Sequence, residues 1–70
     1  MFIVLTNASE GFEGRSIAID SKIITAVFEG KVSKPEDEKA KYGTFVYSHS
    51  TGQNWQVKEK VAKVIELLNS

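Results

Sequence analysis

The chain has 70 residues, 41% of them hydrophobic and 26% charged, which suits one small domain over residues 1–70 and leaves no room for a second. Nine Lys and Arg balance nine Asp and Glu, so no long-range field draws the chain to nucleic acid or to an acidic membrane. The absence of Cys excludes disulfides, Cys-ligated metals and thiol catalysis.

The first half of the chain predicts three short β-strands. Residues 2–6 are a β-favouring run that ends in the turn-forming segment 7–14. Residues 15–19 alternate apolar and small side chains, as a half-buried strand does. A third strand is predicted over residues 23–29, a β-branched stretch that ends at Gly30.

The composition becomes mostly charged between Gly30 and Tyr42, around the only proline, Pro35. Ser33 and Glu36 have the spacing of a capping box, which favours one or two helical turns. A loop fits the same residues, because such a segment has little to bury.

The second half predicts two more strands and a helix. Strands are expected over residues 44–49 and 54–57, each with alternating side chains. A helix is expected over residues 58–69, where one apolar stripe is made of Val61, Val64, Ile65 and Leu68. If Ile65 lies in the core, Ile65→Asp should unfold the domain.

Five strands with hairpin connections and one final helix predict an α+β fold: a five-stranded antiparallel curled sheet or small open barrel with one C-terminal helix. Several strands carry apolar side chains on both faces, such as Phe2 and Val4 opposite Ile3 and Leu5. One helix cannot cover both faces, so the sequence predicts a homo-oligomer or a protein partner.

No arrangement of residues indicates catalysis or metal binding. The only histidine, His49, lies between Ser48 and Ser50, whose side chains point to the opposite face of a strand. The carboxylates lack the spacing of metal ligands. The chain is therefore predicted to be a non-enzymatic protein without a cofactor.

The two long loops, residues 7–14 and 30–42, are the predicted surface for a protein partner. Its candidate residues are Phe12, Glu13, Lys34, Glu36 and Tyr42. The alternative is a nucleotide-like ligand held between subunits, with stacking by aromatic residues and phosphate binding by basic ones. The candidates for that site are Arg15, Lys41, Phe45, Tyr47 and Trp55.

The apolar run at the N-terminus, Phe2 to Leu5, is too short for a signal peptide or a membrane span. A cytoplasmic protein is therefore expected. Nothing in the residues indicates membrane binding.

Several short motifs follow one another along the chain: Leu5-Thr6, Gly14, Ile17-Ala18-Ile19-Asp20, Ile23, Thr44, Gly52, Val57-Lys58-Glu59-Lys60 and Val64. In this succession the chain resembles the small FlbD/SwrD-type proteins, which are linked to flagellar gene expression and swarming, and similar small proteins of bacteriophage genomes. The resemblance implies a β-rich fold closed by a helix and no catalytic residues. Two longer segments, Asn7–Glu13 and Gly30–Tyr42, depart from the family pattern, which implies a scaffold fitted to a different partner. The resemblance thus leads us to expect a small regulatory protein, of the phage-encoded kind, that binds a host protein.

Overall fold

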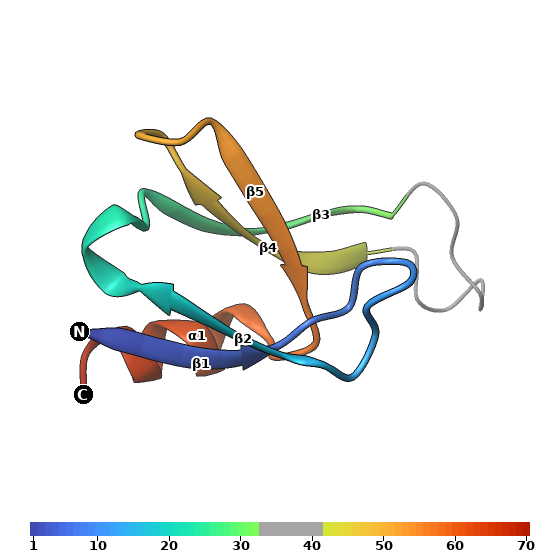
Figure 1. Ribbon diagram of the computed structural model, residues 1–70, viewed down its shortest axis with the longest axis horizontal. Coiled ribbons are helices and arrows are strands. Elements are labelled where there is room, and N and C mark those ends of the chain that lie inside the picture. The colour runs from blue at the N-terminus through green and yellow to red at the C-terminus, as the bar shows by residue number, and fades with distance from the viewer. Residues whose placement is uncertain (33–41) are drawn as a thin grey trace.

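The computed structural model describes residues 1–32 and 42–70, and these carry five β-strands, a short 3-10 helix and one α-helix (Figure 1). In chain order the elements are β1 (Phe2–Thr6), β2 (Ser16–Asp20), η1 (Ser21–Ile23), β3 (Ala26–Lys31), β4 (Tyr42–Ser48), β5 (Gln53–Val57) and α1 (Val61–Leu68). Antiparallel strands followed by a C-terminal helix confirm the predicted α+β class. The capping box predicted at Ser33 and Glu36 lies outside the described residues.

The strands form two open antiparallel sheets, and the prediction of a single five-stranded sheet or barrel is wrong in this respect. β1 pairs with β2, while β4 lies between β3 and β5. The two sheets meet at a corner, where Asn7 bridges to Val57 and the N–H of Lys58 donates to the carbonyl oxygen of Thr6 over 2.8 Å. Beyond this corner β1 and β5 run in different directions (Figure 1), so the described strands do not close into a barrel.

The third strand begins later than the sequence predicts. Ser21–Ile23 form the 3-10 helix, and β3 covers Ala26–Lys31 in place of the predicted 23–29. The carboxylate of Asp20 accepts a hydrogen bond from the N–H of Lys22 (3.1 Å), and this local bond stabilises the turn against the β preference of the isoleucines. The same bond, with the N-terminal ammonium group 3.6 Å away, holds the pKa of Asp20 below its ordinary value.

The core lies between the two sheets and the helix. Its buried hydrophobic side chains among the described residues are Ile3, Leu5, Ile19, Val46, Val57 and Val64. β1 shows how the alternation works, because Ile3 and Leu5 are buried while Phe2 and Val4 are exposed. Each sheet therefore has one covered face and one face open to solvent.

The helix is shorter than the predicted 58–69 and covers Val61–Leu68. Residues 58–60, predicted to be the first turn of the helix, form the linker before it. The backbone N–H of Lys58 donates to Thr6 of β1, and the side chain of Glu59 accepts hydrogen bonds from the same residue. These contacts hold the linker in a non-helical path. Within the described residues, no helix is long and apolar enough to cross a membrane.

The apolar stripe of α1 centres on Val64, which is 0% exposed, whereas Ile65 is 41% exposed. Leu67 and Leu68 pack beside the core at the C-terminal end of the helix. The prediction that Ile65 lies in the core is therefore wrong. The buried stripe is rotated about the helix axis, so that Leu67, on the other side of Val64 from Ile65, packs against the core in its place.

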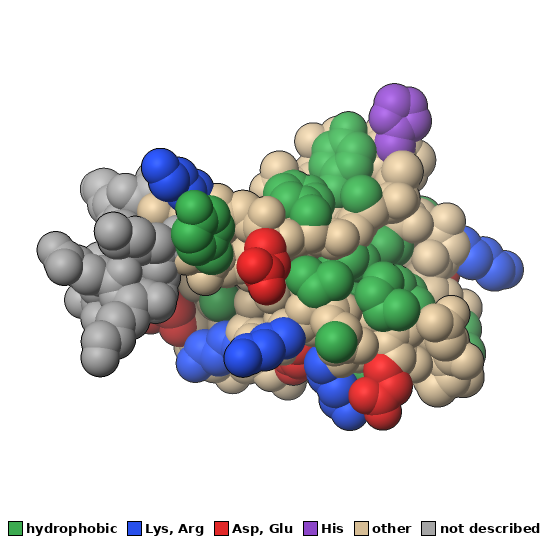
Figure 2. All heavy atoms as spheres, turned by 180° about the vertical axis from the view of Figure 1, so that it is seen from behind, with side chains coloured by type: hydrophobic (Ala, Val, Ile, Leu, Met, Phe, Trp, Pro, Cys, Tyr) green, Lys and Arg blue, Asp and Glu red, His purple; other side chains and the backbone are tan. Residues whose placement is uncertain are grey.

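The outer face of the three-stranded sheet carries aromatic side chains. Phe28 of β3 lies opposite Phe45 of β4, and their rings stack with centroids 5.6 Å apart. Tyr47 lies on the same face, two residues along β4. On the side of the molecule shown in Figure 2, hydrophobic side chains gather over the middle and upper part of the surface. Apolar groups of a single chain thus remain in contact with solvent.

Gly30 provides a test of the aromatic stack. A Cβ atom at this position would lie 3.0 Å from two ring atoms of Phe45, so the ring has to shift slightly in Gly30→Ala, which disturbs its stacking on Phe28. We expect the free energy of unfolding to fall by about 1 kcal/mol, measured by urea denaturation. In a Phe45→Leu background the same change should cost much less, and an equal cost in both backgrounds would contradict this explanation.

Candidate functional site

The loop between β1 and β2, residues 7–14, has a fixed backbone. The N–H of Asn7 donates to the carbonyl oxygen of Arg15 (2.7 Å), and the N–H of Gly14 donates to that of Asn7 (2.9 Å). The side chain of Asn7 also accepts from the N–H of Ser9 (2.9 Å), as in an Asx turn. Gly11, at φ 87°, allows the reversal near the tip. These bonds make the loop an extension of the β1–β2 hairpin.

Phe12 stands at the tip of this loop and is 59% exposed. Its backbone is held on both sides, because its N–H donates to the carbonyl oxygen of Ser9 (3.0 Å) and its own carbonyl oxygen accepts from Arg15 (3.1 Å). Glu10 and Glu13, on either side of it, are exposed. The sequence therefore located this candidate correctly at the surface, with Glu13 beside it.

A second set of bonds fixes the base of the loop to the segment before α1. The Glu59 carboxylate accepts from the N–H of Thr6 at both oxygens (2.9 and 3.1 Å) and from the Thr6 hydroxyl (2.9 Å). Partial burial opposes ionisation of Glu59, but the hydrogen bonds to its carboxylate outweigh this and hold its pKa below the ordinary value. The Thr6–Glu59 contact is thus a clamp of charge-assisted hydrogen bonds between β1 and the segment before α1.

Tyr42, the candidate from the second loop, begins β4 and is 62% exposed. Figure 1 places the start of β4 and the loop of residues 7–14 at the same end of the molecule. The other candidates of the second loop, Lys34 and Glu36, and the candidate phosphate ligand Lys41, lie outside the described residues. Of the predicted partner-binding residues, the structure thus describes Phe12, Glu13 and Tyr42, and all three are exposed.

The aromatic candidates for a stacked ligand do not share one surface. Phe45 and Tyr47 lie on the outer face of the sheet, whereas Trp55 lies opposite Val46 on the other face. Arg15 is exposed at the base of the β1–β2 loop. One chain by itself does not assemble these side chains into one site, and a ligand held between subunits stays a prediction.

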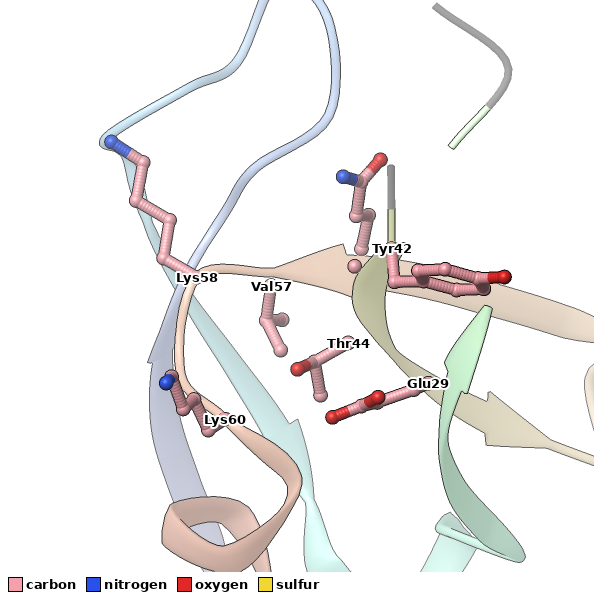
Figure 3. A pocket seen from close by; sticks show the side chains of 8 residues that line it. Glu29, Tyr42, Thr44, Val57, Lys58 and Lys60 are labelled. Carbon is pink, nitrogen blue, oxygen red and sulfur yellow. The ribbon is translucent and has the colours of Figure 1, made fainter. Parts of the chain in front are cut away.

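A shallow depression of about 460 Å³ lies between the linker to α1 and the C-terminal end of β3 (Figure 3). Its lining residues are Glu29, Tyr42, Gly43, Thr44, Gln56, Val57, Lys58 and Lys60. In Figure 3 the oxygen atoms of Thr44 and Glu29 face the same space, while the ring of Tyr42 and the ammonium group of Lys58 point away from it. Sequence reasoning missed this depression, because cross-strand pairing alone brings Glu29, Thr44 and Val57 together.

The single histidine has no catalytic neighbour among the described residues. His49 is exposed, and its backbone N–H donates to the hydroxyl of Thr25 (3.0 Å). The hydroxyl groups of Ser48 and Ser50 lie 3.2 Å apart and pair with each other. In the part of the chain that is described, no three His, Asp or Glu side chains gather as metal ligands would.

Comparisons with protein-family models, curated proteins and solved structures find no match to this chain. The resemblance to FlbD/SwrD-type proteins therefore stays a prediction. The function has to be inferred from the chain's own surface.

Proposed function

We propose that this protein is a non-enzymatic interaction module that binds another protein through the loop of residues 7–14. Phe12 carries the proposal, because an exposed aromatic side chain stands on a backbone held by hydrogen bonds on both sides. Large aromatic side chains dominate the energy of many interfaces. A fixed loop loses little conformational entropy on binding, which favours affinity.

The surroundings of Phe12 indicate the chemistry of the partner. Glu10 and Glu13 are exposed on either side of it, so a fitting partner has an apolar pocket with Lys or Arg at its rim. Tyr42, at the same end of the molecule, extends the surface. The resemblance to FlbD/SwrD-type and similar phage proteins leads us to propose a bacterial host protein as the partner.

Replacing the anchor should abolish binding without unfolding the protein. We expect Phe12→Ala to lower affinity for the partner by at least about thirtyfold, as the loss of an aromatic hot spot does. The measurement is retention of bacterial proteins on the immobilised chain, followed by titration of the protein retained. Phe2→Ala is the matched control, because Phe2 is equally exposed but lies at the opposite end of β1.

Two results would overturn the proposal. One is a partner retained equally by the wild type and by Phe12→Ala. The other is a partner lost in both the Phe12 and Phe2 variants, which would place the interface elsewhere. Circular dichroism of both variants checks that the fold is intact.

A further inference from the structure

We infer that two copies of this chain pair antiparallel through the free edge of β3, with Gly30 on the two-fold axis. The inference does not depend on the proposed function, because it rests on the edge of β3 and not on Phe12, although Tyr42 of the proposed surface is the cross-strand neighbour of Lys31. In the described part of the chain β3 pairs only with β4, so its other edge is open. Phe28, Glu29 and Lys31 in the C-terminal half of the strand are exposed.

The charges of β3 complement each other in only one arrangement. With Gly30 on the axis, Glu29 of each copy lies opposite Lys31 of the other. With Glu29 or Lys31 on the axis, two like charges face each other across the interface. With Phe28 on the axis, neither charge meets an opposite one. If the axis passed between two residues, a residue whose N–H and C=O groups point to the free edge would lie opposite one whose groups point to β4. The backbone hydrogen bonds of an antiparallel pair could not form in that register.

The charged groups of β3 lack partners within the described residues of one chain. Neither Glu29 nor Lys31 forms an ion pair there, and both side chains are exposed. Directly opposed residues of neighbouring strands have Cβ atoms about 4.5–5.5 Å apart, within reach of an ion pair. Pairing through β3 would therefore form two symmetric ion pairs together with a short set of backbone hydrogen bonds around Gly30, because the two strands overlap at residues 29–31.

The second copy also changes the depression beside β3. Glu29 lines its rim with an exposed carboxylate, opposite Thr44 of β4. In the paired form, Lys31 of the second copy lies next to Glu29 on the same face of the joined sheet. The second copy would therefore add a basic side chain beside the carboxylate that lines the depression. The joined sheet has six strands, and its outer face doubles the aromatic surface of Phe28 and Phe45.

Charge reversal tests the register. We expect sedimentation equilibrium at low salt to show a monomer–dimer equilibrium, with Kd raised about tenfold or more by Glu29→Lys and by Lys31→Glu. The double variant Glu29→Lys with Lys31→Glu should restore the wild-type Kd. Glu66→Lys, the same reversal on the exposed side of α1, should leave Kd unchanged. A wild type that stays monomeric at millimolar concentration, or a Kd that the double variant does not restore, would overturn the inference.

Cross-linking gives a second test that does not depend on the strength of the ion pairs. Because the chain has no Cys, Glu29→Cys and Lys31→Cys each introduce a single thiol. Oxidation of an equimolar mixture should form the disulfide-linked heterodimer well ahead of either linked homodimer, because only position 29 of one copy and position 31 of the other lie opposite. Linked products in the proportions of random pairing, with the heterodimer about as abundant as the two homodimers together, would contradict the register. Failure of the Phe12 experiment would leave both of these results unaffected.

Discussion

Val64→Asp is expected to leave the protein unfolded at room temperature. Val64 is 0% exposed and lies in the core with Val46 and Val57. A carboxylate at this position loses its hydration without gaining a partner, which costs several kcal/mol. A domain of this length has a total stability of only about 4–10 kcal/mol. The loss is therefore comparable with the whole stability of the fold.

The adjacent helix position provides the control. Ile65→Asp places the same side chain one residue further along α1, where 41% of the isoleucine is exposed and the new carboxylate can stay hydrated. We expect this variant to keep the far-ultraviolet circular dichroism and cooperative melting of the wild type, with a small loss of stability. If Ile65→Asp unfolds and Val64→Asp does not, the orientation of the helix is wrong.

Glu59→Gln is expected to lower the free energy of unfolding by about 2 kcal/mol at pH 7. The carboxylate accepts bonds from both the N–H and the hydroxyl of Thr6, and hydrogen bonds to a charged group are among the stronger ones in proteins. The amide of Gln keeps the size of the side chain but loses the charge and one acceptor. Glu66→Gln is the control, because its bridge to Lys63 (3.7 Å) is exposed and such pairs contribute little.

The effect of Glu59→Gln should also depend on pH. The pKa of Glu59 lies below its ordinary value of 4.5 in the folded protein, so the folded state favours the ionised form. Its contribution is complete above the ordinary value and is lost as the pH falls through the lowered one. Urea denaturation between pH 7 and pH 2.5 should therefore show the difference between wild type and variant shrinking below about pH 4.5. Asp20 is present in both proteins, so its own pH-dependent contribution to the free energy of unfolding cancels in the difference between them. A difference that stays constant with pH would contradict the clamp.

The sequence predicted the elements whose evidence is local. A continuous β-favouring run identified β1, alternation of side chains identified β4 and β5, and helical spacing identified α1. Phe12 was found for the same reason, because glycine and asparagine around it signal a turn. The exposed position of Tyr42 followed from its place next to a charged segment.

The errors arose where a distant residue decides the local structure. Val61, Val64 and Leu68 fit a helical stripe with either Ile65 or Leu67, and only the position of the sheets selects Leu67. The helix starts late because the linker before it is bound to Thr6, more than fifty positions earlier. The depression was missed because it is formed by the register of three strands, which no short stretch of sequence specifies.

The corner between the two sheets has a consequence for how the chain acquires its structure during translation. Thr6 is made more than fifty residues before its backbone and side-chain partners, Lys58 and Glu59. At about 5–20 amino acids per second, the ribosome takes several seconds to make the intervening segment. The β1–β2 hairpin, with Ile3, Leu5 and Ile19 uncovered, therefore stays without its packing partners until the later strands and the helix that complete the core have left the ribosome.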